Sequence, residues 1–171
     1  MTGCARADES IAYIALGSNL GDRERHLDAG LAALRALPGV RHVVVSRIYE
    51  TDPVGPGEQR PYLNAVARVR TRLAPRALLD RLLAIERSEG RERSGERNAP
   101  RTLDLDLLLY GESEIAEPGL VVPHPRIAER PFVLEPLCDL APDLVVPGAG
   151  APVSGLAAAV RDPAAVRVRE T

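Results

Sequence analysis

The chain has 171 residues, 45% of them hydrophobic, and a formal net charge of -2 at pH 7. This length and apolar content suffice for one domain with its own core, and the small net charge argues against a nucleic-acid-binding surface. All 22 basic residues are arginine, which excludes mechanisms that need a lysine, such as a Walker-type phosphate loop or a Schiff base.

The two ends of the chain and its cysteines carry no targeting or redox signal. No apolar run approaches the roughly 20 residues that a membrane span requires, and the first ten residues lack the apolar centre of a signal peptide. Cys4 and Cys138 have neither metal-ligand spacing nor an expected disulfide. We predict a cytoplasmic monomer with a single domain over 1–171, loose tails at 1–10 and about 162–171, and no nucleic-acid or membrane partner.

The first predicted elements are a strand over residues 11–16, a turn at 17–21 and a helix. Asp22 is placed to cap this helix, whose leucines recur every three or four residues until Pro38 and Gly39 end the pattern. The glycine-containing turn has no phosphate-cradle lysine, so we interpret it as a plain strand-to-helix connection.

Two more strands are predicted over 43–49 and 62–72, on either side of a loop at 51–61. The loop holds three prolines and two glycines, a composition that excludes regular structure but suits an ordered binding loop. Tyr62 and Asn64 begin the second of these strands on one side. An aromatic ring beside an amide is able to bind a flat heterocycle, although these residues at a strand start are more often structural.

A leucine-rich helix is predicted from Ala74 and Pro75 to about Gly90, followed by a charged segment. Residues 87–101 alternate acids with arginines, which is typical of a solvated loop. The same segment also brings positive charge to the start of the next strand, because it ends with Arg101.

Residues 103–107 read Leu-Asp-Leu-Asp-Leu, so Asp104 and Asp106 are predicted on one face of a strand and the leucines on the other. Two such carboxylates lie roughly 7 Å apart and repel each other unless a cation is near. An isolated Asp-x-Asp is more often the solvated face of an edge strand. The neighbouring arginines favour a site for Mg²⁺ and a nucleotide instead.

The last predicted elements follow a basic segment. A helix is predicted over about 133–140, and it is preceded by His124, Arg126 and Arg130. Cations before a helix N-terminus suit the binding of a phosphate tail. A lone histidine in a loop, however, usually has no functional role. A short helix at 153–160 comes before the end of the chain.

Taken together, these motifs resemble the 6-hydroxymethyl-7,8-dihydropterin pyrophosphokinase family of folate biosynthesis. The matching segments, in the family's order, are Gly17 to Gly21, Thr51 to Asn64, Arg91 with Arg93, Pro100 to Asp106 and Val122 to Arg126. The resemblance implies a ferredoxin-like α+β fold, with an antiparallel sheet and helices packed on it. It also implies transfer of diphosphate from ATP to the pterin hydroxymethyl group, with AMP as the second product.

The same resemblance implies a role for individual residues. Asp104 and Asp106 would hold two Mg²⁺ ions and act in catalysis with Arg91 and Arg101. The ATP-binding set would be Glu86, Arg91, Arg101, Tyr110, His124 and Arg130. The pterin-binding set would be Thr51, Pro53, Gly55, Tyr62, Asn64 and Phe132.

Two departures from the family and two rival functions accompany this interpretation. Asn98 stands where many members have tryptophan, and Pro125 where many have tyrosine. A phosphohydrolase with an Asp-x-Asp nucleophile is one rival, but such enzymes generally recruit a lysine. A ferredoxin-like binding module without catalysis is the other, and it leaves the paired acids beside the arginines unexplained.

Overall fold

The computed structural model describes residues 8–53, 57–90 and 100–170, and in these ranges the main element is a six-stranded antiparallel sheet. Its central pair is β1 (Ser10–Ser18) and β4 (Tyr62–Thr71), and β5 (Asp104–Tyr110) pairs with the other side of β1. The far side of β4 is lined by two shorter strands in succession, β2 (Val40–Val45) and β3 (Tyr49–Thr51).

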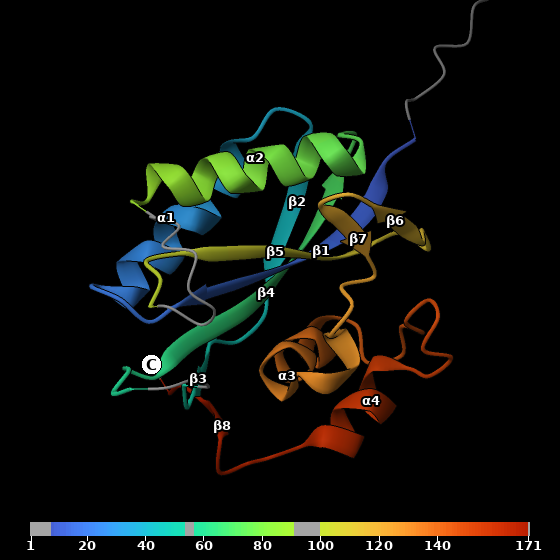
Figure 1. Ribbon diagram of the computed structural model, residues 1–171. Helices are drawn as coiled ribbons and strands as arrows, with labels where there is room; N and C mark the ends of the chain where they lie inside the picture. Colours follow the sequence, from blue (N-terminus) through green and yellow to red (C-terminus); the bar gives the residue numbers. More distant parts are fainter. Residues whose placement is uncertain (1–7, 54–56, 91–99, 171) are drawn as a thin grey trace, which may run out of the picture.

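Two helices cover one face of the sheet, α1 (Arg23–Ala36) and α2 (Pro75–Ser88) (Figure 1). The Asp22 side chain accepts a hydrogen bond from the Arg25 backbone N–H at 3.1 Å, which confirms it as the cap of α1. When β2 and β3 are counted as one interrupted strand, the chain follows the order βαββαβ, and the sheet order is that of the ferredoxin-like α+β fold. The predicted fold class is confirmed.

The core between these helices and the sheet is made of the predicted leucine stripes. Leu27 and Leu34 of α1 and Leu78 and Leu82 of α2 are at most 1% exposed, and they pack on the sheet together with Ile14. Burying one such side chain stabilises the fold by about 1.5–3 kcal/mol. The apolar periodicity therefore accounts for both helices and for the face that they cover.

A second layer covers the opposite face of the sheet with α3 (Pro131–Leu140) and α4 (Val153–Val160) (Figure 1). The hairpin β6 (Ile115–Glu117) and β7 (Leu120–Val122) and a 3-10 turn, η1 (Ile127–Glu129), lead into α3. Apolar residues of α3 and α4 form a second core with sheet residues that include Tyr13 and Val66. Cys138 is half-buried beside this core. None of the described helices is long and apolar enough to cross a membrane.

Strand β5 contains a bulge that the sequence pattern did not predict. Tyr13 of β1 pairs with Leu109, and Ile14 pairs with Leu107, so Leu108 is an extra residue in the ladder. Leu108 and Leu109 consequently both join the second core, whereas Leu105 and Leu107 face α1 and α2. The Leu108 carbonyl accepts the His124 N–H at 2.9 Å, so the bulge also holds the segment before α3.

Two predictions about chain segments are corrected. The strand expected over 43–49 is divided, because β2 ends at Val45 and β3 begins at Tyr49. The end of the chain, expected to be loose from about 162, forms β8 (Val166–Val168), which pairs with β3. Arg167 of β8 forms an ion pair with Asp52 at 3.0 Å. The backbone of β8 adds a strand to the otherwise open edge of the sheet at β3.

Candidate active site

One cavity of about 110 Å³ lies where the ends of several strands meet the start of α3. It lies on the α3 face of the sheet and brings together residues from β1, β3, β4, β5 and α3 that are far apart in sequence. The lining side chains with polar or aromatic groups are Thr51, Asp52, Tyr62, Asn64, Arg101, Asp104, Asp106, Arg130 and Phe132. Eight of these nine residues were predicted to bind the metal ions, the phosphates or the pterin, and Asp52 is the exception.

Asp104 and Asp106 occupy the face that the alternating pattern predicted. They pair across the ladder with Gly17 and Ala15 of β1, two small residues that leave room beside the carboxylates. A Cβ at Gly17 would lie 3.1 Å from Asn64 Oδ1, so any larger residue would force the Asn64 side chain to shift by a few tenths of an ångström. The side chains of Asp104 and Asp106 are 19% and 36% exposed.

Each carboxylate faces an arginine. Arg101 Nη1 lies 2.8 Å from Asp104 Oδ2, and Arg130 Nη1 lies 3.8 Å from Asp106 Oδ2. Burial alone would lower the pKa of Arg101, but Asp104 and its hydrogen bond raise it above the usual value. Burial lowers the pKa of Arg130 below its usual value, with Asp106 opposing the change. Both guanidiniums remain protonated at neutral pH, as arginine does in proteins generally.

The opposite wall of the cavity is less charged. The Asn64 side chain donates a hydrogen bond from Nδ2 to Thr51 Oγ1 at 2.7 Å, and both residues are buried. The guanidinium carbon of Arg130 lies 5.7 Å from the centre of the Phe132 ring, so the ring is held beside the phosphate side. Tyr62 completes this wall.

Some predicted site residues lie away from the cavity lining. Glu86 is buried at the end of α2, and its Oε1 accepts the Leu105 N–H at 2.7 Å, which fixes the strand between the two aspartates. Tyr110, at the other end of β5, donates its hydroxyl proton to the Leu73 carbonyl at 2.7 Å. Pro53 is described but does not line the cavity. Gly55 and Arg91 lie outside the described residues, as does Asn98.

His124 lies beside the charged side of the cavity. Its Nδ1 accepts the Arg126 backbone N–H at 3.1 Å. Burial, and then the positive charge of Arg130, lower the pKa of His124 to about 4, from an ordinary value of 6.5. The ring is therefore neutral at pH 7, and since Nδ1 is the acceptor, Nε2 carries the proton and is a donor.

The lowered pKa of His124 predicts part of the acid sensitivity of the fold. Below pH 6.5 the unfolded chain binds a proton at this residue, whereas the folded chain does so only near pH 4, so the folded state loses stability as the pH falls through this window. We expect a smaller fall in the free energy of unfolding between pH 7 and pH 5 for His124→Gln than for the wild type, measured by urea denaturation. Equal falls in the two proteins would contradict this.

Sequence reasoning missed Asn19, which connects three segments around the cavity. Its Oδ1 accepts the Arg101 N–H at 2.8 Å, and its Nδ2 donates to Gln59 Oε1 at 3.3 Å and to the Arg60 carbonyl at 3.4 Å. The Asn19 N–H itself donates to the Arg101 carbonyl at 3.1 Å. The turn at 17–21 therefore holds Arg101 and the end of the loop at 51–61 in one arrangement.

Comparison with known proteins decides the family. The sequence model of the 7,8-dihydro-6-hydroxymethylpterin-pyrophosphokinase family matches residues 13–142, a span that contains every described residue of the cavity lining. The chain belongs to this family. Within it, the chain is 51% identical over 135 residues to the 2-amino-4-hydroxy-6-hydroxymethyldihydropteridine pyrophosphokinase of Pseudomonas aeruginosa, covering 79% of this chain and 83% of the relative. The Bacillus subtilis enzyme of the same name is 48% identical over 131 residues, covering 77% and 78%.

Solved structures agree on the fold of this pyrophosphokinase family member. A crystal structure of HPPK-DHPS in complex with substrates matches with a TM-score of 0.70 and 14% identity, over 89% of this chain and 44% of that one. Wild-type HPPK-DHPS of Plasmodium falciparum with STZ-DHP matches with a TM-score of 0.71 and 14% identity, over 89% and 43%. The chain thus spans less than half the length of those proteins, and at this identity the likeness concerns the fold alone.

Proposed function

We propose that this protein transfers diphosphate from ATP to the hydroxymethyl group of 6-hydroxymethyl-7,8-dihydropterin, in tetrahydrofolate biosynthesis. The hydroxymethyl oxygen forms a bond to the β-phosphorus, the bond from that phosphorus to the oxygen of the α-phosphate breaks, and AMP leaves as the hydroxyl proton is released. The observation that carries the proposal is a single cavity with two aspartates and two arginines on one side and Thr51, Asn64 and Phe132 on the other.

The arginines of the site are proposed to bind the triphosphate. Guanidinium groups match phosphate oxygens in two parallel hydrogen bonds, and Arg101 and Arg130 keep their charge at neutral pH. Arg91 and His124 are proposed to contact phosphate as well, His124 through its protonated Nε2. Glu86 and Tyr110 are proposed to border the nucleotide.

The donor set at Asp104 and Asp106 fits Mg²⁺, which prefers oxygen ligands and usually takes one or two carboxylates together with substrate phosphates and water. No group of three or more histidine, cysteine or acidic residues placed to hold a metal occurs in the part of the chain that the structure describes. Substrate phosphates and water would complete the coordination. We propose two Mg²⁺ ions, which would neutralise phosphate charge and polarise the β-phosphorus.

The pterin is proposed to lie between Phe132 and the wall of Thr51, Tyr62 and Asn64, with Pro53 and Gly55 in the adjoining loop. The contact with Thr51 fixes the plane of the Asn64 amide, and a fixed amide offers both a donor and an acceptor to a heterocycle edge. An aromatic ring such as Phe132 stacks on a flat heterocycle in an offset arrangement. The hydroxymethyl group would then point towards the charged side of the cavity.

The nucleotide product tests the proposed function. Incubation with ATP, Mg²⁺ and the hydroxymethylpterin should form AMP in equal amount to the pterin diphosphate, resolved by anion-exchange chromatography. A phosphohydrolase would release phosphate and form ADP, and a binding module would leave ATP intact. Formation of ADP alone would contradict the proposal.

We also propose that the protein is a cytoplasmic monomer with one domain over 1–171. Large apolar side chains on the described surface are few and scattered over different elements, which supports a monomer. They are Ile11, Leu20, Val44, Val121, Val145 and Val168. Analytical ultracentrifugation checks the oligomeric state, and a concentration-dependent sedimentation coefficient would argue against a monomer.

A further inference from the structure

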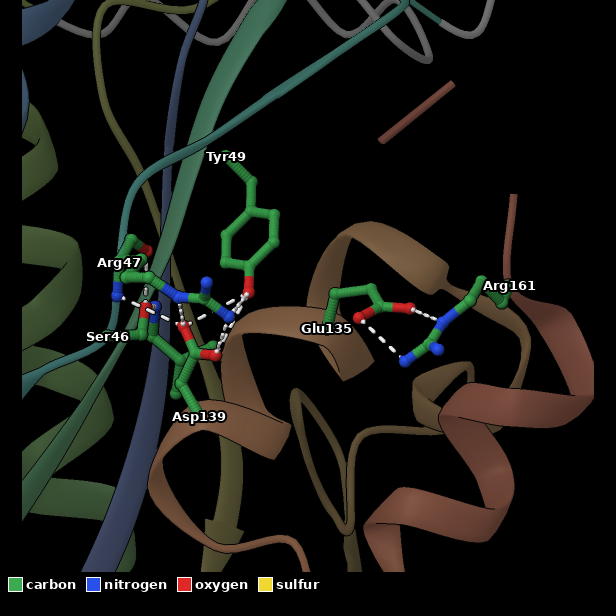
Figure 2. Close-up of polar contacts among 7 residues, drawn as sticks. Ser46, Arg47, Tyr49, Glu135, Asp139 and Arg161 are labelled. Carbon is green, nitrogen blue, oxygen red and sulfur yellow. Dashed lines mark hydrogen bonds and ion pairs between the residues drawn. The ribbon is translucent and has the colours of Figure 1, made fainter. Parts of the chain in front are cut away.

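A dense polar contact joins the C-terminal half of α3 to the edge of the sheet, outside the cavity (Figure 2). The Asp139 carboxylate accepts hydrogen bonds from Arg47 N at 3.2 Å, Arg47 Nε at 3.1 Å and Arg47 Nη2 at 2.6 Å. It also accepts the Tyr49 hydroxyl proton at 3.0 Å. We name Ser46, Arg47, Tyr49 and Asp139 the Asp139 cluster.

The break between β2 and β3 creates this contact. The Ser46 hydroxyl accepts the Val66 N–H at 2.9 Å, where a backbone carbonyl of the neighbouring strand would ordinarily do so, and the Ser46 N–H donates to the Val66 carbonyl at 2.9 Å. The ladder is thus maintained through the break by a side chain. The next N–H, that of Arg47, points away from β4 and donates to Asp139.

At the sheet end, the cluster reaches the cavity wall within two residues. Tyr49 and Thr51 are buried on the same face of β3, as residues two apart in a strand must be. Tyr49 pairs across the ladder with Asn64, which in turn donates to Thr51. Burial and then the hydrogen bond to Asp139 raise the pKa of Tyr49 to about 12, so its hydroxyl is a constant donor.

At the helix end, the cluster fixes α3, the helix that carries Phe132. Asp139 and Phe132 belong to the same helix and are seven residues apart, which corresponds to about 10 Å along the axis. Pro136 lies between them and has no N–H to donate to the Phe132 carbonyl, so α3 lacks one backbone hydrogen bond at this point. Contacts with the sheet therefore contribute to the position of Phe132.

We propose that the Asp139 cluster is a positioning device for the pterin: it fixes α3 relative to β3 and thereby sets the separation between Phe132 and the Thr51–Asn64 pair. The inference rests on the proposed function. Asp104 and Asp106 lie on β5, and Arg101 precedes it, so these three residues belong to the strand on the far side of β1 from β3 and β4. Arg130, the residue before α3, is the proposed phosphate contact that would shift with Phe132. Loss of the cluster therefore weakens pterin binding more than nucleotide binding, to which Arg101 and the two aspartates also contribute.

The chain offers a matched control on the same helix. Glu135 is one turn before Asp139, and it accepts a hydrogen bond at 2.7 Å from Nε of Arg161, which follows α4 (Figure 2). Glu135→Gln makes the same change of charge as Asp139→Asn and also removes an ion pair of α3. It does not involve the sheet edge. Tyr49→Phe removes one hydroxyl and keeps the buried ring.

The test compares the affinities of these variants for two ligands by calorimetry: a non-hydrolysable ATP analogue with Mg²⁺, and the pterin at saturating analogue. Asp139→Asn should weaken pterin binding about tenfold and Tyr49→Phe about threefold, as expected for a charged and a neutral hydrogen bond. Analogue affinity should stay within twofold, and Glu135→Gln should match the wild type for both ligands.

Unchanged pterin affinity in both cluster variants, or equal weakening of both ligands, would overturn the inference. A similar loss in Glu135→Gln would do so as well, since it would indicate a general loosening of α3. If Asp139→Asn fails to fold, Tyr49→Phe decides alone. The proposed function is judged separately, from AMP formation by the wild type, so its failure is distinguishable from that of the inference.

Discussion

Replacing Asp106 by asparagine is expected to lower kcat for AMP formation by at least about 10²–10³-fold, the loss seen when one group that stabilises transition-state charge is removed. Asp106 is one of only two cavity carboxylates proposed to hold Mg²⁺, so the substitution removes half of the protein's contribution to the metal site. Initial rates at saturating ATP, Mg²⁺ and pterin measure the effect.

The same substitution should change the free energy of unfolding of the ligand-free protein by less than about 1 kcal/mol. The Asp106 side chain is 36% exposed, and its ion pair with Arg130 is long, at 3.8 Å. Replacing Asp104 should change the free energy of unfolding more, because Asp104 forms a shorter ion pair with Arg101, at 2.8 Å, and its side chain is only 19% exposed. Asp106→Asn is therefore the cleaner test of the metal site.

Ligand-induced stabilisation separates a metal ligand from a structural acid. A ligand present at 100 times its dissociation constant stabilises the folded state by about 2.7 kcal/mol, so Mg²⁺ with an ATP analogue should raise the Tm of the wild type by several degrees. The rise should be much smaller for Asp106→Asn and unchanged for Asp80→Asn, a control in which an exposed acid of α2 is neutralised. A normal rise in Asp106→Asn would mean that Asp106 does not hold the metal.

The parts of this molecule that sequence predicts are those with a local period. The alternation of Asp104 and Asp106 with leucines gave the correct face, because on a strand a side chain's side follows directly from its position. The positions of α1 and α2 were predicted in the same way, from the residues at their starts and from leucines that recur every three or four positions. The bulge at Leu108 was missed, since a run of three leucines is compatible with either face and only the pairing with Tyr13 and Ile14 decides.

The parts that sequence did not predict depend on partners far along the chain. Arg47 and Asp139 are 92 residues apart, and neither residue is unusual in its own segment. The arginines of the chain end indicated a solvated tail, yet Arg167 pairs with Asp52 and β8 adds to the edge of β3. Charge pattern alone does not distinguish a solvated arginine from one whose acidic partner is brought near by the fold.

Asn19 is the most consequential residue of this second kind, and Asn19→Ala is expected to lower kcat by about 10²-fold. The substitution removes the acceptor of the Arg101 N–H and both donors to the loop end at Gln59 and Arg60. A displacement of about 1 Å in a positioned group is enough for a loss of this size. Leaving the partly buried Arg101 N–H without its partner should also lower the free energy of unfolding, by about 1 kcal/mol.

Asn19→Asp separates the two functions of this side chain. It keeps an oxygen to accept the Arg101 N–H, but it places a second oxygen where Nδ2 now donates to Gln59 and Arg60, and these acceptors repel it. Asn19→Asp should therefore raise KM for the pterin while the affinity for an ATP analogue stays within about twofold. Asn19→Ala should weaken the binding of both the pterin and the ATP analogue. Gln59→Ala removes one loop contact only and should have the smallest effect. A folded Asn19→Ala protein with wild-type kcat and affinities would show that Arg101 is held in place without Asn19.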